Sequence, residues 1–195
     1  GVVGPAGLEV AYELESMTSD RLRDEVGEIA LVREDERIVG IGSSAVMAAF
    51  THTGTASRFT AGSYGVFYAG LDIETAIAES KSGQARFLSA TSEPACETSM
   101  RSCMTTVLHP LLDIRGHEYN HLHNPDDWPT AQQFGREVKD SGDSGLWYRS
   151  VRNPGGECIA AFKAAAVSPA TQATHYRFVW DGNSVTGVFE ARDVA

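Results

Sequence analysis

Apolar residues recur along the chain with two different periods, which predicts both helices and strands. Over 73–88 they return every three to four positions behind Asp72, a favoured N-cap residue, so we expect one amphipathic helix there. At ~100° per residue, Glu79 lies roughly 130° from the centre of the apolar stripe and should face away from the core. Further helices are expected over 43–50 and 130–140, with a short surface helix over 16–28.

Runs of β-branched and aromatic residues between turn residues predict the strands. The run 63–70 lies between glycines and carries Tyr68 near its end. Two runs joined by a turn at Asp181 and Gly182 predict a hairpin. Other strands are expected over 36–42, 146–151 and 157–162. Because strands and helices do not alternate regularly, the order favours an α+β fold over a doubly wound sheet.

Size and charge narrow the class of protein. With 195 residues and 42% hydrophobic content, the chain can bury one core, and we expect a single domain. The net charge of −10 disfavours direct binding to nucleic acid or to an anionic membrane. No apolar run approaches the ~18 residues of a membrane helix, so we expect a cytoplasmic protein. Cys96, Cys103 and Cys158 form no Cys-x-x-Cys pair and are expected to be reduced, structural thiols.

One motif suggests a metal. His117, Glu118 and His121 match H-E-x-x-H, in which two histidines one helical turn apart bind zinc and the glutamate activates water. The motif needs a stable helix, yet Gly116 precedes it and Pro125 follows, which leaves about two turns at most. We therefore expect no metal site and keep a zinc hydrolase as the remoter alternative.

A second group of residues has chemistry that suits a nucleotide. Arg58 can clamp a phosphate through two N–H groups, Tyr68 can stack on a flat ring, and Glu79 can stabilise positive charge developing on a sugar. Each also has an ordinary structural interpretation, as a surface ion-pair partner, a core aromatic and a solvated helix residue. Residue types alone favour the structural interpretations.

The sequence around these residues resembles the RES domain family, which is named for an arginine, a glutamate and a serine. The serine of the family stands in a Tyr-x-Ser-Val-Arg block before Pro-Gly-Gly-Glu, and Ser150 occupies that place here. Two departures are modest: Thr60 follows the Arg-Phe pair, and Arg149 replaces a residue that is often proline. The segments that carry the resemblance are 58–60, 65–70, 76–79, 148–158 and 175–182.

The resemblance implies a fold and a set of roles. The fold would be similar to that of diphtheria-toxin-like ADP-ribosyltransferases, with a central split β-sheet and flanking helices, as a single RES domain over 1–195. Its motif-bearing core would span about 20–185, with 1–15 as an extension. In the NAD⁺ pocket, Arg58 would hold the pyrophosphate, Tyr68 would stack on a ring, Ser150 would bond ribose or nicotinamide, and Glu79 would be the catalytic carboxylate.

The resemblance also implies a biological role. RES proteins are toxins of type II toxin-antitoxin systems, so this chain would deplete cellular NAD⁺ by cleaving the nicotinamide–ribose bond. No cofactor is implied beyond NAD⁺ as substrate and phosphate as an optional co-substrate. The partner would be an Xre-type helix-turn-helix antitoxin, which would supply any DNA contact. The resemblance is also compatible with a homodimer of this chain within a larger toxin-antitoxin complex. The alternatives are a mono-ADP-ribosyltransferase with a protein target and a silent binding module.

Overall fold

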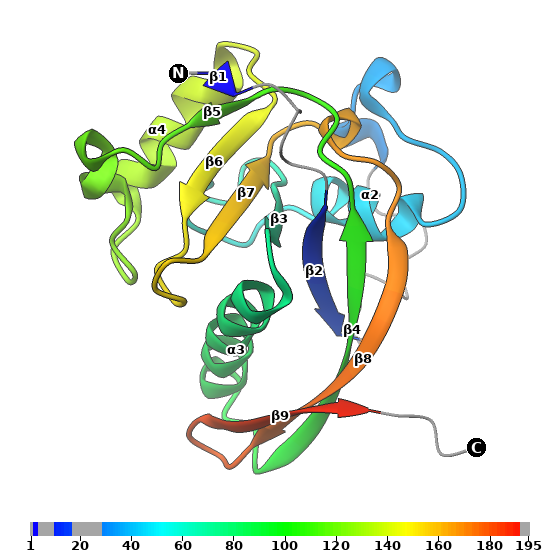
Figure 1. Cartoon of the computed structure of the whole chain (residues 1–195), viewed down its shortest axis with the longest axis vertical. Helices are drawn as coiled ribbons and strands as arrows, with labels where there is room; N and C mark the ends of the chain where they lie inside the picture. Colours follow the sequence, from blue (N-terminus) through cyan, green and yellow to red (C-terminus); the bar gives the residue numbers. More distant parts are fainter. Residues whose placement is uncertain (1, 4–9, 17–28, 192–195) are drawn as a thin grey trace.

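The computed structural model of the protein describes residues 2–3, 10–16 and 29–191. Nine strands form one sheet in the order β1-β5-β6-β7-β3-β2-β4-β8-β9, and helices flank it (Figure 1). The strands are β1 Val2–Val3, β2 Ala11–Ser16, β3 Phe67–Gly70, β4 Cys96–Thr105, β5 Leu111–Asp113, β6 Gly145–Arg149, β7 Glu157–Ala161, β8 Thr171–Trp180 and β9 Val185–Ala191. The α-helices are α2 Ser43–Thr51, α3 Ile73–Ala90 and α4 Pro129–Asp140, and the 3₁₀ helices are η1 Ile29–Leu31, η2 Glu34–Glu36, η3 His117–Leu122 and η4 Ala164–Ala166.

The sheet is joined weakly in its middle. Strands β2 and β3 share one residue pair, Tyr12 with Gly70, whereas β2 pairs with β4 along its whole length. The halves β1-β5-β6-β7-β3 and β2-β4-β8-β9 diverge from this join (Figure 1). Only β5 and β6 run parallel among the described pairs. The α+β class expected from the sequence is confirmed, and the weak join corresponds to the expected split.

Each half of the sheet has its own helix. The helix α3 packs Leu88 against Met100 of β4 and Phe178 of β8, and α4 packs Val138 into a cluster with Leu146 of β6. A third cluster packs α2 against β3 and β7. No helix in the described ranges has the length and apolarity needed to span a bilayer. The halves can therefore diverge and still each bury an apolar face.

Most of the expected elements are present. The helices predicted over 73–88, 43–50 and 130–140 are confirmed as α3, α2 and α4, and the predicted hairpin is confirmed as β8 and β9. The strands predicted over 146–151 and 157–162 are β6 and β7. The surface helix predicted over 16–28 lies outside the described residues, apart from Ser16 at the end of β2.

Two predicted strands differ from the structure. The strand over 36–42 is wrong, because Gly40 and Gly42 have positive φ angles of 118° and 84° and turn the chain into α2. A Cβ on Gly42 would clash with the carbonyl oxygen of Ala170, so a side chain does not fit there. The strand predicted over 63–70 begins only at Phe67.

The strand β2 was not predicted. It lies between β3 and β4, so Ala11–Glu15 belong to the sheet rather than to an extension of the domain. Its sequence alternates between small or apolar and polar residues, which is a strand signal. The signal is short, because β2 has six residues.

The first turn of α3 is tied to the loop 150–156. The buried Thr75 donates its hydroxyl to Asp72 Oδ2 at 2.8 Å and accepts from Asn153 Nδ2 at 2.8 Å. Asp72 also caps the helix by accepting the N–H of Thr75 at 2.6 Å. A Cβ on Gly156 would clash with the Thr75 hydroxyl, so the loop packs directly on this turn. We call Asp72, Thr75 and Asn153 the Thr75 junction.

The Thr75 junction generates a stability prediction. Asp72→Ala removes the N-cap acceptor and should lower the free energy of unfolding by about 1–2 kcal/mol, measured by urea denaturation. Asp72→Asn keeps a side-chain oxygen and should lose less than half as much. Equal losses in the two variants would contradict the assignment of the cap.

Candidate functional site

A cavity of about 360 Å³ lies where the two halves of the sheet join. Tyr12 and Gly70, the residue pair of the join, both line it. Its remaining walls come from α3, from the loops around Arg58 and Trp128, and from Tyr148 and Cys158 on β6 and β7. The volume lies at the lower end of the range for small-molecule sites. We call it the central cavity.

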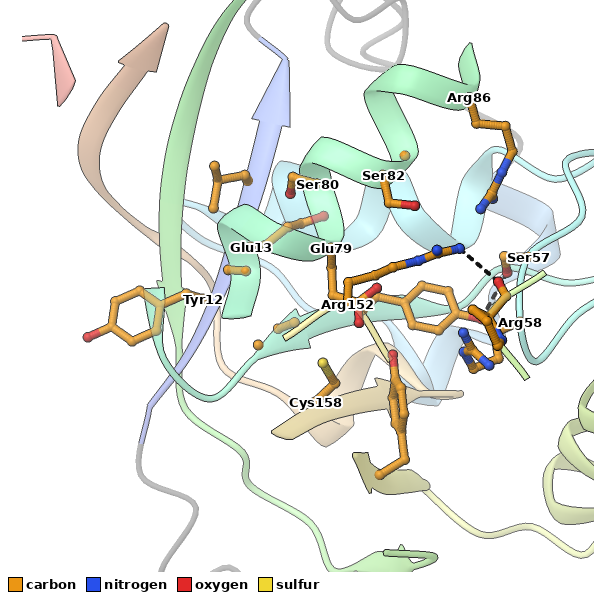
Figure 2. Close-up of a pocket in the computed structure, with 18 of the residues that line it drawn as sticks. Tyr12, Glu13, Ser57, Arg58, Glu79, Ser80, Ser82, Arg86, Arg152 and Cys158 are labelled. Carbon is orange, nitrogen blue, oxygen red and sulfur yellow. Dashed lines mark hydrogen bonds between the residues drawn. The ribbon is translucent and has the colours of Figure 1, made fainter. Parts of the chain in front are cut away.

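Residues of the central cavity differ in character from one end to the other. In Figure 2, Tyr12 and Glu13 of β2 lie at one end, Arg58 and Arg86 lie at the opposite end, and Glu79 lies between them. A ligand in this cavity would therefore meet a carboxylate in its middle and guanidinium groups on one side.

Glu79 and Ser150 are in direct contact, although 71 positions separate them in the sequence. The Ser150 hydroxyl donates to Glu79 Oε1 at 2.6 Å. The hydroxyl oxygen of Ser150 in turn accepts the backbone N–H groups of Arg152 at 3.1 Å and Asn153 at 2.9 Å. Because a hydroxyl has one proton and both amides donate to its oxygen, that proton is directed at Glu79. Ser150 thus fixes the orientation of the Glu79 carboxylate, which accepts its hydrogen bond.

Arg58 is buried and is fixed by the backbone. Its Nη1 donates to the carbonyl oxygens of Asn124 at 2.6 Å and Leu122 at 3.4 Å. Its side chain is 8% exposed, and the residue lines the central cavity. An arginine side chain is a cation with planar N–H donors, so this end of the cavity suits an anion.

Tyr68 braces the loop that carries Arg58. Its hydroxyl accepts the N–H of Phe59 at 3.0 Å and forms a 2.8 Å hydrogen bond with the Ser57 hydroxyl. Burial raises the pKa of Tyr68 to about 12, so the phenol stays neutral at physiological pH. Tyr68 also lines the central cavity. The structure therefore places Arg58, Tyr68 and Glu79 in the wall of the central cavity. Ser150 is not among the residues that line it and is connected to it through Glu79.

Two further arginines in the cavity wall were not predicted as site residues. Arg152 forms an ion pair with Asp126 at 2.8 Å and donates to the carbonyl of Pro125. Arg86 lies over the ring of Trp128, with its guanidinium carbon 4.3 Å from the ring centroid. Burial lowers the pKa of Arg86, and the positive charges of Arg152 and Arg58 add to this effect. The helical wheel could have identified Arg86, because it follows Glu79 by seven residues on α3.

The floor of the cavity carries no ionised nucleophile. Burial raises the pKa of the Cys158 thiol, and the nearby charge of Glu79 raises it further. Burial likewise raises the pKa of the neighbouring Tyr148 well above its usual value. All three cysteines are thiols in the structure, as expected.

The H-E-x-x-H segment does not have the geometry that its zinc chemistry needs. It forms the 3₁₀ helix η3, in which residues four apart do not stack as they do in an α-helix. The nearby His123 uses both ring nitrogens, with Nδ1 bonded to the carbonyl of Tyr119 and Nε2 accepting the N–H of Arg149. In the ranges that the structure describes, no group of three or more potential ligands is placed to hold a metal. The zinc hydrolase alternative gains no support.

Comparisons with known proteins agree with the geometry. The chain is similar to a chain in the crystal structure of the M. tuberculosis MbcT-MbcA toxin-antitoxin complex, with a TM-score of 0.53 and 15% identity over 93% of this chain and 88% of that one. At that identity the likeness shows the fold. An uncharacterized protein of Sinorhizobium fredii, y4oC, is 27% identical over 99% of this chain and 81% of its own length. The family model of the RES domain matches residues 36–181, and the chain therefore belongs to the RES domain family.

Proposed function

We propose that the protein is a toxin of a toxin-antitoxin pair and depletes NAD⁺ by cleaving its nicotinamide–ribose bond. The observation that carries this proposal is Glu79, which lines a cavity whose one end holds arginines and which accepts a 2.6 Å hydrogen bond from Ser150 behind the cavity wall. A fixed carboxylate beside an anion site suits a substrate that has both a glycosidic bond and phosphates. Family membership supports the proposal, and so does the fold shared with a chain of a toxin-antitoxin complex.

The proposed reaction starts with binding of the diphosphate at the arginine end. Arg58 would hold the diphosphate, and this remote binding would orient the reacting ribose beside Glu79. Tyr68 would stack on a ring of the bound nucleotide through the part of its side chain that lines the cavity. The other end, beside Tyr12 and Glu13, would then receive the nicotinamide.

Bond breaking would leave a positively charged ribose. The C–N bond to nicotinamide breaks, and its electron pair goes to the ring nitrogen, which neutralises the pyridinium. The oxocarbenium-like ribose that remains is stabilised by the carboxylate of Glu79, as in glycoside hydrolysis. Water then adds and loses a proton to give ADP-ribose, or phosphate adds to give the phosphate ester. Ser150 keeps Glu79 oriented throughout, because its one proton is already committed to that carboxylate.

The partner in this proposal is an Xre-type helix-turn-helix antitoxin. A chain with a net charge of −10 is poorly suited to bind an operator by itself, so DNA binding would belong to the antitoxin. An antitoxin that binds the folded toxin also stabilises it by mass action.

Replacing the carboxylate tests the proposed reaction. Glu79→Gln keeps an oxygen that can accept from Ser150, so the variant should fold normally and lose at least about 100-fold in the rate of NAD⁺ consumption. The measurement is chromatography of NAD⁺ and its products from purified protein, with and without phosphate.

The products distinguish the acceptors. ADP-ribose identifies water as the acceptor, its phosphate ester identifies phosphate, and label transferred from NAD⁺ to protein identifies an ADP-ribosyltransferase. Consumption of NAD⁺ by Glu79→Gln at the wild-type rate would rule out the role of this residue.

Arg58 requires a careful choice of substitution. Arg58→Ala would leave two backbone carbonyls without their donor, at a cost of about 1–3 kcal/mol per buried group, so lost activity could reflect lost stability. Arg58→Lys keeps the charge but not the planar fork, and should raise KM for NAD⁺ at least about 10-fold. Thermal unfolding of the same preparation provides the control. An unchanged KM in a folded Arg58→Lys protein would contradict the phosphate-binding role.

The biological proposal predicts a phenotype. Expression of the wild-type chain in bacteria should arrest growth and lower cellular NAD⁺, and Glu79→Gln should do neither. Coexpression of a helix-turn-helix protein encoded beside the gene should restore growth and copurify with the toxin. Growth arrest with unchanged NAD⁺ would separate toxicity from the proposed chemistry.

A further inference from the structure

Among the arginines of the central cavity, Arg86 makes the fewest polar contacts with the rest of the described protein. Arg58 donates to two carbonyls, and Arg152 is paired with Asp126. Across the described residues, Arg86 forms no hydrogen bond or ion pair, and its guanidinium packs on the ring face of Trp128. Its N–H donors are therefore available to a ligand, whereas the stacked ring restricts where they lie.

Trp128 is itself held in place. Its indole Nε1 donates to the carbonyl of Pro125 at 3.1 Å, and both residues line the central cavity. Arg152 donates to the same carbonyl at 2.8 Å. The loop that carries Trp128 thus positions the Arg86 and Arg152 side chains together.

Helix α3 sets the spacing between Arg86 and the proposed catalytic carboxylate. Glu79 and Arg86 are seven residues apart, which is about two turns and roughly 10 Å along one face of the helix. Ser82 and Gly83 lie between them and also line the cavity. A Cβ added at Gly83 would have no atom within 4 Å. The helix therefore leaves open space at Gly83, between the carboxylate of Glu79 and the guanidinium of Arg86. We call Ser82 and Gly83 the Ser82–Gly83 step.

The charge balance favours a ligand with more than one negative charge. Arg58 and Arg86 lie at one end of the cavity, and Arg152 extends toward that end from beside Glu79 (Figure 2). Among the described residues, the one ion pair that these arginines form is between Arg152 and Asp126. This cluster of positive charge contrasts with the net charge of −10 of the whole chain. Two adjacent phosphates would satisfy it better than one.

We propose that Arg86 binds the phosphate of the substrate's diphosphate that lies farther from the reacting ribose. Trp128 is a positioning residue that acts through Arg86, and the diphosphate passes over Ser82 and Gly83 on the cavity side of α3. Arg58 and Arg86 together would then select a diphosphate over a monophosphate. This inference rests on the proposed function, because it places the reacting ribose at Glu79.

The test compares the binding of ADP and AMP by isothermal titration calorimetry. The wild-type protein should bind ADP more tightly than AMP. ADP and AMP both carry the phosphate on the adenosine side, so Arg86→Ala should weaken the binding of both about 10- to 100-fold, which is the effect of losing charge-assisted hydrogen bonds. Binding of adenosine, which has no phosphate, should change less than about 3-fold. Arg177→Ala removes an equal charge from an exposed ion pair on β8 and should change neither ADP nor AMP binding. ADP and AMP binding unaffected by Arg86→Ala, or a wild-type protein that binds the two nucleotides equally or not at all, would overturn the proposal.

Two further variants separate positioning from general structural damage. Trp128→Ala should weaken ADP binding and Trp128→Phe should restore most of it, because a phenyl ring also accepts a guanidinium on its face. Gly83→Leu should block the step and weaken ADP binding, while the same side chain at the exposed Ser89 of α3 should not. Equal ADP binding by Gly83→Leu and Ser89→Leu would contradict the proposed path.

Kinetics with NAD⁺ keep this inference separate from the proposed function. Arg86→Ala should raise KM for NAD⁺ and leave kcat within about 2-fold, since it removes binding that is equal in the ground and transition states. If Arg86 governs ADP binding but NAD⁺ is not cleaved, the proposed function fails and the diphosphate site stands. If NAD⁺ is cleaved with an unchanged KM in Arg86→Ala, the inference fails and the function stands.

Discussion

The geometry of the site depends on the Thr75 junction, which holds the first turn of α3 against the loop 150–156. Thr75 is fully buried and bonds Asp72 on its own helix and Asn153 on the loop. One turn further along the helix, Glu79 meets Ser150 of that loop at 2.6 Å. A shift of the loop by even 1 Å would break the second contact, and small misplacements of this kind are costly in catalysis. The junction therefore converts two segments that are distant in sequence into one rigid unit.

The weak join of the sheet leaves the cavity into which α3 places Glu79. Because β2 and β3 share one residue pair, the halves diverge and leave a cavity where a continuous sheet would be filled by side chains. Each half keeps a helix of its own, so the opening does not expose the core. The helix α3 runs along the opening and contributes Glu79 and Arg86 to it. One element thus carries the carboxylate and part of the proposed anion site at a fixed distance.

Local patterns in the sequence predicted α3 well, because its period, its Asp72 cap and the direction of Glu79 are all encoded within a few residues. Ser150 was found only through the resemblance to the RES family, since no local pattern shows which residue 71 positions away will contact Glu79. Arg86 was not predicted, although it lies two turns from Glu79 on the same side of α3, because its residue type alone indicates only a surface arginine. The strand signal of β2 extends over only six residues, which is too short to be decisive. The contact between Trp128 and Arg86 depends on tertiary packing, which single-sequence patterns do not report.

The central claim is that Ser150 acts through Glu79 in cleaving the nicotinamide–ribose bond of NAD⁺. The most direct test is a double-mutant cycle on the rate of nicotinamide release, with Glu79→Gln, Ser150→Ala and the double variant. If the two residues work as one unit, the double variant should be no slower than Glu79→Gln alone, because residues that act together are not additive. Effects that multiply, or a wild-type protein that leaves NAD⁺ intact, would contradict the account.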